Sequence, residues 1–415
     1  MKKINNPEFW INKLENPDKV IFNFQEVNNT NKKIYKELSN LNLNKFYFDI
    51  NDKTINLFTN SKLLNYANLT ITGKYFFKKN GKQIKNYKIK DLIKNCNLDK
   101  ALIIKKGITK KRVNIRRFPT CLINSSSKDT IHQDYFQETA LSPYEPVIIL
   151  QESADKEWVY IQSKIYPGWV LRKNIKFINN FSEYQNVYSA SSFLRVIDDF
   201  VTTEPNIYIN KGKTITFQMG DKIPIIHDNF HSKTQYSLNS YKVPTLNKSD
   251  KNKLLIKNNN SIHNGNLPFT RKNIIVQAFK LLGERYGWGG MNNRRDCSRF
   301  VSDIFNCFGL NLPRDCSVQN KTAILNNISL REKKISEKLK ILDNLNSGDL
   351  IYTEGHVMIY LNKIGKNYYV IHNGSGFSYK NKKFDVHGVM IMPLNLNLLS
   401  RNVSYIEVLI NCICL

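Results

Sequence analysis

The chain has 415 residues, which is long for a single domain and predicts two to four domains. Hydrophobic residues make up 41% of it and aromatic residues 12%, which excludes disorder throughout, and no apolar run approaches the roughly 18 residues of a membrane-spanning helix. The formal net charge of +28 would suit nucleic acid, an anionic membrane or another acidic polymer, but a coding bias toward Lys, Asn, Ile, Tyr and Phe explains it better.

The N-terminal region is expected to be mostly helical. Its first residues, MKKINNPEFWINKLENPDKV, include basic residues but lack the apolar core of a secretory signal. We therefore expect a cytoplasmic protein, or one of the periplasm or cell envelope if the natural N-terminus carries a signal. Apolar residues in NKKIYKELSNL and IKDLIKNCNLDKALI recur at helical spacing, which assigns residues 1–108 to a helical region.

The hydrophobic period changes at about residue 109. The β-rich runs RVNIRRFPT, EPVIILQES, KEWVYIQS and PGWVLRKNI are separated by turn residues, which predicts a small barrel over residues 109–177. A similar set, SFLRVIDDFVTTE and NIYINKGKTITFQMGDKIPII, predicts a second barrel over 178–235. The Asn-, Lys- and Ser-rich stretch 236–266 is typical of a linker, with room for a short hairpin around KLLIK.

Cysteine and histidine positions argue against a disulfide framework and against a metal site. Seven cysteines are scattered along the chain, an odd number, and no CxxC occurs. His227 and His231, in HDNFH, have the spacing of two metal ligands, but no third ligand accompanies them, so a solvated loop is the better interpretation. We expect no metal and no cofactor.

Residues 267–415 have the denser pattern of an α+β domain, with helices first and a sheet after them. In FTRKNIIVQAFKLLGERYGWGG the apolar residues share one helical face, Thr270 suits the N-cap, and a glycine loop ends the helix. The segment GDLIYTEGHVMIYLNKIGKNYYVIHNGSG alternates as antiparallel strands. The whole chain is thus predicted to be a multidomain α+β protein.

The tetrapeptide RDCS occurs twice, around Cys297 and around Cys316. A cysteine attacks a carbonyl as the thiolate, which a helix N-terminus and a histidine both favour. Cys297 begins a strongly amphipathic helix after the glycine loop, whereas Cys316 follows a proline turn and precedes a weaker apolar pattern. Cys297 is the better candidate nucleophile, with a buried structural cysteine as the alternative on local pattern alone.

Two histidines complete a candidate catalytic set. His356 opens the apolar strand VMIYL, and His372 ends the next strand, YYVIH. Adjacent antiparallel strands can place both imidazoles side by side, one to contact the sulfur of Cys297 and the other to hold the first in its tautomer. Each histidine alone could be an ordinary strand-end residue, but three fitting positions in one domain favour catalysis.

Several segments resemble the motifs of the NlpC-type cysteine peptidases, which are papain-like hydrolases of bacterial peptidoglycan peptides. In the family's order these are YGWGGMNNRRDCSRF, LPRDCSVQ, GDLIYTEGHVMIYL and YYVIHNGSG, and the resemblance covers about 268–395. Upstream, VNIRRFPT, DYFQETALSP and EWVYIQSKIYPGWV resemble the family's first bacterial SH3-like barrel. The second barrel and NPEFWINKLENPDKVIFN resemble its multidomain subgroup, which has an N-terminal stabilising region.

The resemblance implies a role for each matching residue. Cys297 matches the nucleophile, His356 the base and His372 the orienting residue. Arg299 departs from the glycine that many relatives have, and Cys316 stands where relatives often have serine, so the second RDCS is interpreted as an accidental repeat beside the substrate. The implied substrate-binding residues are Tyr286, Asp296, Ser298 and Cys316, with Asp134, Tyr135 and Glu138 from the barrel loop DYFQETAL.

The implied reaction is hydrolysis of the bond between the γ-carboxyl of D-glutamate and a diamino acid. The substrates would be peptidoglycan stem peptides or muropeptides with a free N-terminal L-alanine, because in the subgroup the first barrel narrows the cleft. The alternative is a wall-binding or nucleic-acid-binding SH3-like protein with an inactive peptidase domain, against which the intact catalytic set argues. Acyl transfer or amidase chemistry, the diamino acid and the oligomeric state stay open, and no nucleic-acid partner is expected.

Overall fold

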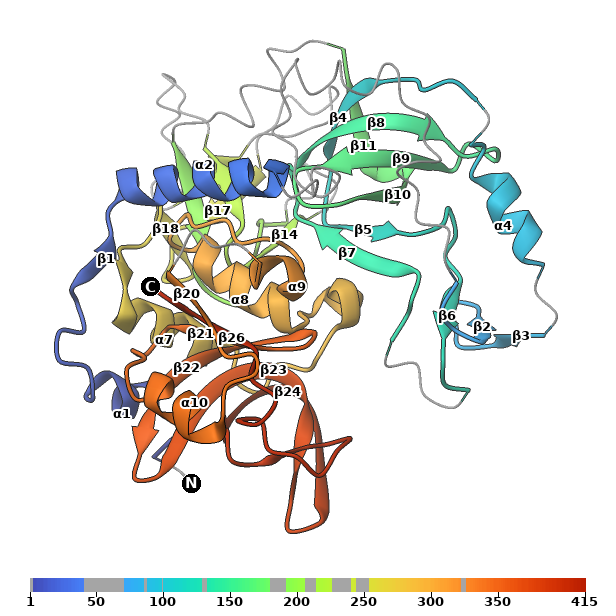
Figure 1. Ribbon diagram of the computed structural model, residues 1–415. Coiled ribbons are helices and arrows are strands. Elements are labelled where there is room, and N and C mark those ends of the chain that lie inside the picture. The colour runs from blue at the N-terminus through green and yellow to red at the C-terminus, as the bar shows by residue number, and fades with distance from the viewer. Residues whose placement is uncertain are drawn as a thin grey trace.

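The computed structural model describes most of the chain (Figure 1). Within the part that it describes, no helix is long and apolar enough to cross a membrane, and no group of three or more His, Cys, Asp and Glu side chains is arranged to hold a metal ion. His227 and His231 lie outside the described residues. The described residues are 3–40, 71–85, 88–98, 100–128, 133–179, 192–205, 214–225, 240–243, 254–321 and 326–415.

The C-terminal domain is built on a seven-stranded antiparallel sheet, which confirms the expected α+β architecture. The strands follow the order β20, β26, β21, β22, β23 and β24, and the short β25 pairs with β23. Their bounds are β20 Asn326–Ser329, β21 Leu350–Thr353, β22 His356–Ile364, β23 Asn367–Tyr379, β24 Lys382–Pro393, β25 Asn397–Leu398 and β26 Asn411–Cys414.

Alternation along β22 explains why this sheet is covered on both faces. Val357, Ile359 and Leu361 pack into an apolar cluster with α7 and α8, while Met358 and Tyr360 point into a second cluster with α10. Because β22 is buried on both sides, the position of His356 at its first residue is fixed. The helices are α7 Arg271–Lys280, α8 Cys297–Asn306, α9 Cys316–Gln319 and α10 Ile335–Leu342, with the 3-10 turn η4 at Trp288–Asn293.

The N-terminal segment packs on the peptidase-like domain rather than forming a unit of its own. Trp10 in α1 (Pro7–Ile11) is fully buried, and its ring centroid lies 5.5 Å from that of Tyr369. The strand β1 (Val20–Phe22) pairs with β19 (Phe269–Thr270), which leads directly into α7. The helix α2 (Phe24–Asn40) follows and lies along the top of the domain (Figure 1).

The first barrel is a second seven-stranded antiparallel sheet, in the order β11, β4, β8, β9, β10, β5 and β7. One apolar core fills it, and it includes Ile115, Ile149, Ile161 and Val170, which are all fully buried. The strands are β4 Lys105–Thr109, β5 Val113–Arg116, β7 Gln137–Leu141, β8 Pro146–Glu152, β9 Trp158–Ser163, β10 Pro167–Leu171 and β11 Ile175–Ile178, the last preceded by η3 Arg172–Asn174.

The region expected to be helical also contains strands that join the barrel. β2 (Tyr75–Phe77) pairs with β3 (Gln83–Ile84) and with β6 (Ile123–Ser125), which lies between β5 and β7 in the chain. The helix α4 (Ile89–Asn95) follows β3. The backbone N–H and C=O groups of β2 need hydrogen-bond partners, and β6, which is distant in the sequence, supplies them.

The second β region extends through the stretch that the sequence assigns to a linker, which corrects that prediction. Within 236–266, β18 pairs with β12, so this stretch supplies a sheet partner instead of a flexible connection. The polar composition of this stretch suggested a linker, although it contains Leu254, Ile256 and Ile262, which are buried. The strands are β12 Phe193–Val196, β13 Phe200–Thr202, β14 Thr216–Gln218, β15 Lys222–Pro224, β16 Ser240–Val243, β17 Leu254–Lys257 and β18 Ile262–Asn264.

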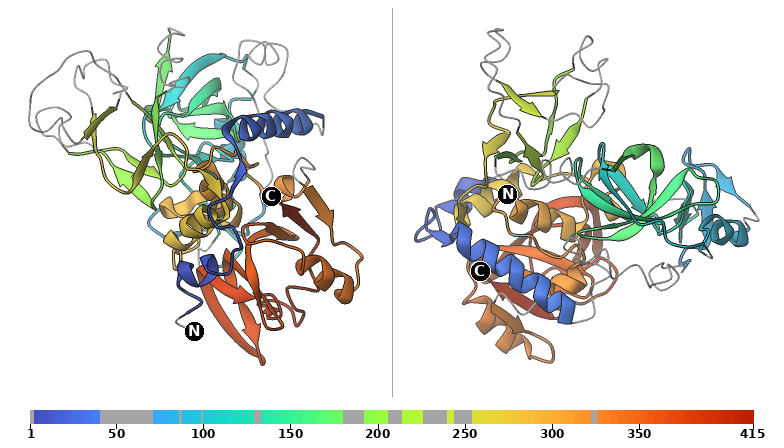
Figure 2. Two further views of the ribbon diagram at one scale, coloured as in Figure 1. Left: turned by 90° about the vertical axis from the view of Figure 1, so that its left-hand side faces the viewer. Right: turned by 90° about the horizontal axis from the view of Figure 1, so that it is seen from above.

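The two β regions extend from the peptidase-like domain in different directions, as the view from above shows (Figure 2). The first barrel is docked by β7, which packs against the glycine loop in η4. Gly289 has φ +54°, and a Cβ there would lie 2.8 Å from the carbonyl oxygen of Gln137. Glycine is therefore required where the backbones of barrel and loop meet.

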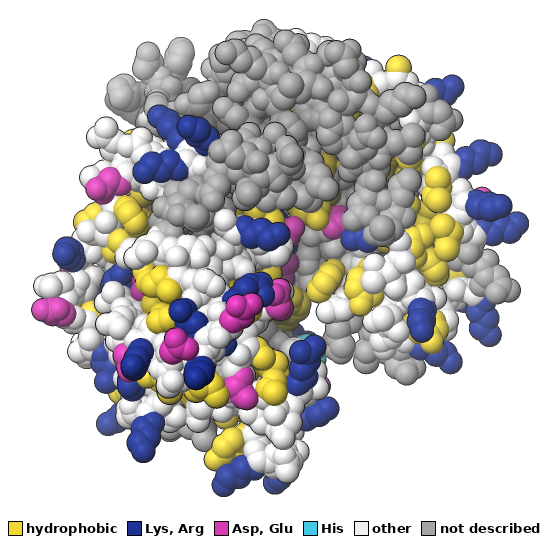
Figure 3. Space-filling view, viewed as in Figure 1, with side chains coloured by type: hydrophobic (Ala, Val, Ile, Leu, Met, Phe, Trp, Pro, Cys, Tyr) yellow, Lys and Arg dark blue, Asp and Glu magenta, His cyan; other side chains and the backbone are white. Residues whose placement is uncertain are grey.

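Positive charge is not gathered into one patch on the face drawn in Figure 3. Lys and Arg side chains are spread over the described surface there, with Asp and Glu among them. A single basic groove of the kind that tracks a nucleic-acid backbone is not formed by the described residues of this face. The net charge of +28 thus gives no location for a ligand.

Candidate active site

Cys297 is the first residue of α8, as the sequence predicts. The side chain of Asp296 caps the helix by accepting from the backbone N–H of Arg299 at 2.9 Å. Cys297 is only 6% exposed, and its sulfur lies 4.0 Å from the carbonyl oxygen of Gly355, in the turn before His356. The thiol thus faces the start of β22 across the cleft.

The structure brings the two predicted imidazoles together. His356 Nε2 and His372 Nδ1 lie 2.7 Å apart, and the rings meet edge to face with centroids 5.0 Å apart. His372 is fully buried, and its Nε2 has no hydrogen-bond partner among the described residues. If His356 Nδ1 is to accept a proton from the thiol, His356 Nε2 must donate to His372 Nδ1, which puts the remaining hydrogen of His372 on Nε2.

Gly374 leaves the space in which the two histidines meet. A Cβ at this position would lie 2.8 Å from His372 Cε1 and 3.5 Å from His356 Cε1. His372 is fully buried, and both histidines lie on paired β-strands, so the His372 ring cannot move aside cheaply. Position 374, which follows His372 and Asn373, must therefore be glycine for the two imidazoles to meet.

The closed cleft favours a neutral thiol and a neutral imidazole in the resting protein. Burial lowers the pKa of His356 to about 4, although the nearby Asp296 opposes this, and burial together with His356 lowers the pKa of His372 still further. The hydrogen bond to the thiol of Cys316, and then burial, raise the pKa of Cys297. These directions oppose the thiolate–imidazolium pair expected from the helix start, because desolvation outweighs the helix dipole here.

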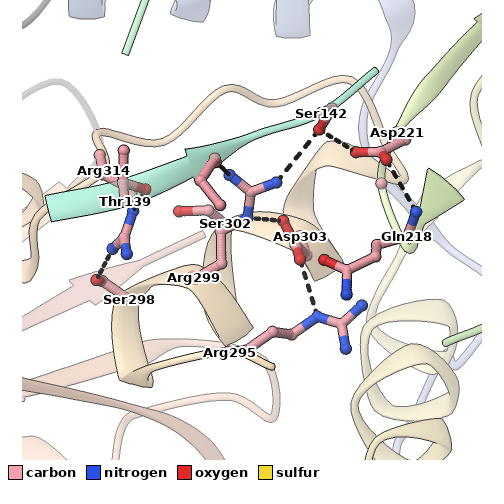
Figure 4. Close-up of polar contacts among 12 residues, drawn as sticks. Thr139, Ser142, Gln218, Asp221, Arg295, Ser298, Arg299, Ser302, Asp303 and Arg314 are labelled. Carbon is pink, nitrogen blue, oxygen red and sulfur yellow. Dashed lines mark hydrogen bonds and ion pairs between the residues drawn. The ribbon is translucent and has the colours of Figure 1, made fainter. Parts of the chain in front are cut away.

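Arg314 and Asp296 form a buried ion pair beside the nucleophile. Arg314 Nη2 donates to Asp296 Oδ2 at 2.5 Å. Its Nη1 donates to Ser298 Oγ at 2.9 Å and its Nε donates to Thr139 Oγ1 at 2.6 Å (Figure 4). Burial would raise the pKa of Asp296, but the charge and hydrogen bonds of Arg314 hold it below its usual range. Both oxygens of Asp296 are thus already bound by protein donors.

Arg299, the departure from the family pattern, joins the nucleophile helix to the barrel. Its guanidinium pairs with Asp303 one turn later at 2.6 Å, and its Nη1 donates to the carbonyl oxygen of Ala140 in β7 at 3.3 Å. Asp303 also accepts from Arg295 Nε at 2.8 Å (Figure 4). A charged side chain here replaces glycine because it reaches a buried carboxylate and a strand carbonyl at once.

The three residues predicted from the barrel loop lie in different settings. Asp134 is 2% exposed and binds Arg116 Nη1 at 2.5 Å, so it holds the loop together and does not face the cleft. The hydroxyl of Tyr135 lies 3.1 Å from Gln133 Oε1, which lines the cleft. Glu138 accepts from Arg117 Nε at 2.5 Å and points toward the active-site side of the barrel.

Two residues near the acids of this site, Tyr166 and Asp315, were not predicted from the sequence. Tyr166 donates from its hydroxyl to Glu138 Oε2 at 3.1 Å. The backbone carbonyl of Asp315, from the second RDCS, accepts from the N–H groups of Val318 and Gln319. Burial raises the pKa of its carboxyl group, Arg314 opposes this, and Asp296 and Glu138 raise it further. Only the repeat itself signalled Asp315, and no sequence pattern distinguished Tyr166 from other barrel aromatics.

The first barrel forms one wall of the cleft that opens at His356. The cavity has a volume of about 320 Å³. Tyr286 lines it, and the backbone N–H of this residue donates to the carbonyl oxygen of His387 at 2.8 Å. Its walls are Ser125, Ser126, Ser127 and Gln133 from the barrel, and Tyr286, His356, Gly374, Ser375 and His387 from the C-terminal domain.

Comparisons with known proteins agree with this architecture. Residues 283–388 match the NlpC/P60 family, and residues 124–171 match the SH3 domain of SH3b1 type. A solved NlpC/P60 endopeptidase from Photobacterium damselae subsp. piscicida is 19% identical, covers 99% of this chain and 96% of its own, and superposes with a TM-score of 0.74. A solved NlpC/P60 family protein from Bacillus cereus is 18% identical over 74% of this chain and 98% of its own, with a TM-score of 0.51.

No curated protein matches the chain. The chain thus contains a C-terminal NlpC/P60 domain and an SH3b domain, which confirms the expected multidomain architecture. The domain match supports a cysteine peptidase that acts on cell-wall material. The two solved structures show that the fold is shared along nearly their full length.

Gly374→Ala is expected to separate the imidazole pair, because the added methyl would overlap His372. Peptide hydrolysis should fall by at least about 10-fold with the fold retained, as off-rotamer rings cost about 1 kcal/mol each. Ser378→Ala, four residues further along β23, is the control. Wild-type kcat in Gly374→Ala at an unchanged melting temperature would contradict the argument.

The acid limb of activity should lie well below the usual histidine range. His356 must be neutral to accept the thiol proton, and burial lowers its pKa from 6.5 to about 4. We therefore expect kcat/KM to stay constant from neutral pH down to about pH 5 and to fall near pH 4. Samples held at each pH and assayed at pH 7 control for unfolding, and a midpoint near 6.5 would refute the neutral pair.

Proposed function

We propose that the protein hydrolyses the bond between the γ-carboxyl of D-glutamate and a diamino acid in peptidoglycan-derived peptides with a free N-terminal L-alanine. One observation carries this proposal: the docked barrel brings Glu138 and Tyr166 to the side of α8 where Asp315 and Asp296 gather. An ammonium group is the ligand that such a set of acids would bind. The NlpC/P60 match supplies the peptidase class.

Asp315 is the acid best suited to the ammonium group. Asp296 is saturated by Arg314 and by the N–H of Gly289, and Glu138 is bound by Arg117 and Tyr166. The raised pKa of Asp315 reflects burial and the like charges of Asp296 and Glu138, which Arg314 offsets only in part. A substrate ammonium group would add positive charge and relieve that repulsion.

The reaction begins as His356 Nδ1 takes the proton of the Cys297 thiol while the sulfur attacks the γ-carbonyl. The oxyanion would be met by the backbone N–H of Cys297, because N–H groups in the first helical turn have no helical acceptor. His356, now an imidazolium, protonates the leaving amine, and His372 Nδ1 keeps its orientation through the 2.7 Å hydrogen bond. Water then releases the acyl group with His356 as base.

Cys297→Ala is expected to reduce peptide hydrolysis by about 10⁴-fold or more, and His356→Ala nearly as much, because thiol and base act as one unit. His372→Ala should cost less, since it supports the base without touching the carbonyl. Cys121→Ser, at an exposed thiol outside the site, is the matched control. Release of the diamino acid, followed by mass spectrometry, measures all four, and activity that survives Cys297→Ala would assign the nucleophile elsewhere.

Acetylation of the alanine amine is expected to protect the peptide from cleavage. A charged hydrogen bond in a buried site is worth roughly 1.5–3 kcal/mol, so kcat/KM should fall by about 10- to 100-fold, and the acetyl bulk adds to this.

Asp315→Asn serves as the second arm of that comparison. It should lower kcat/KM for the free peptide and leave the already poor rate on the acetylated peptide little changed. Equal rates of the wild type on both peptides would mean that the barrel does not select a free amine.

A further inference from the structure

The two RDCS tetrapeptides meet in the fold, and so do their thiols. Cys297 begins α8 after Asp296, and Cys316 begins α9 after Asp315. Cys316 packs against the same apolar cluster that contains Cys297, and each thiol shifts the pKa of the other, so the two sulfurs lie near each other. Cys297 is buried, whereas Cys316 is partly exposed, so solvent reaches the pair from the Cys316 side.

A network of buried hydrogen bonds holds the two helix starts in place. Arg314, two residues before Cys316, binds both neighbours of Cys297: Asp296 at 2.5 Å and Ser298 at 2.9 Å, the contact drawn in Figure 4. Gln319, three residues after Cys316, donates to Ser302 Oγ in α8 at 3.1 Å. Both flanks of Cys316 are thus tied to the segment of Cys297, which holds the two helix starts side by side.

The pair shares a proton in a way that suits oxidation. When the thiol of Cys297 donates to Cys316, the pKa of Cys316 falls, although burial opposes this, and the pKa of Cys297 rises. The more exposed sulfur is therefore the one that ionises first. Thiolate character and exposure together decide which cysteine a peroxide attacks.

We infer that Cys297 and Cys316 form a site of reversible oxidation, at which hydrogen peroxide converts the nucleophile and its neighbour into an intramolecular disulfide. The Cys316 thiolate attacks one peroxide oxygen, the O–O bond breaks, and hydroxide leaves with a sulfenic acid on Cys316. The sulfur of Cys297 then displaces the sulfenic hydroxyl, which takes up the Cys297 proton and leaves as water. The two sulfurs lose two electrons, and the peroxide is reduced to water.

The disulfide would remove the thiol that attacks the carbonyl, so oxidation switches hydrolysis off. It would also protect the nucleophile, because a sulfur bound in a disulfide does not proceed to the irreversible sulfinic and sulfonic acids. The effect on activity depends on the proposed role of Cys297, whereas formation of the bond does not.

The full-length protein is treated with hydrogen peroxide, its remaining thiols are alkylated, and digested peptides are mapped by mass spectrometry. We expect a linked peptide that joins Cys297 to Cys316, a mass lower by about 2 Da per disulfide, and a loss of hydrolysis that dithiothreitol reverses. In Cys316→Ser, peroxide should inactivate the protein more slowly, because the thiolate that peroxide attacks is absent, and no linked peptide should form.

Cys414→Ser is the matched control, because Cys414 is also a partly exposed thiol hydrogen-bonded to a buried one, Cys412, but on β26. This variant should still form the Cys297–Cys316 link. Recovery of both cysteines as alkylated thiols or as unlinked oxidised acids would overturn the inference. A linked peptide in a protein that cleaves no muropeptide would instead refute the proposed function and leave the oxidation site standing.

Discussion

The buried ion pair between Asp296 and Arg314 is the interaction on which the rest of the site depends. Asp296 caps the nucleophile helix and accepts from the N–H of Gly289 at 3.1 Å, while Arg314 reaches Thr139 in the barrel. Removal of one partner from such a pair leaves an uncompensated buried charge and costs about 3–5 kcal/mol. This ion pair therefore couples the positions of four parts of the fold: α8, the glycine loop, the second RDCS and the first barrel.

Burial sets the protonation states in this cleft more strongly than the helix end does. The same exclusion of water lowers the pKa of His356 and raises that of Asp315, so the site holds a neutral base and a buried acid. A neutral thiol and imidazole exchange one proton during attack and need no ion pair beforehand. In the proposed function, acids beside the barrel provide the charge that distinguishes a free amine from an acylated one.

The net charge of this protein is positive, whereas the charged groups near Cys297 include several acids. A formal charge of +28 describes a surface on which Lys and Arg are dispersed, while the residues gathered beside the nucleophile include Glu138, Asp296 and Asp315. Net charge governs solubility and non-specific association, whereas a binding site is defined by the few groups that share a desolvated cavity. The second RDCS illustrates this, because Asp315 and Cys316 each shift the pKa of a group in the first RDCS or are shifted by one.

Local pattern was sufficient for features that depend on neighbours in the chain. The period of apolar residues predicted α7, α8 and the antiparallel β21–β23, Thr270 was recognisable as an N-cap, and the order of motifs indicated the family. Tertiary structure alone decided which distant groups meet. Asp134 binds Arg116, Tyr166 donates to Glu138, and β18 pairs with β12, because burial and hydrogen-bond satisfaction act between segments that no sequence period relates.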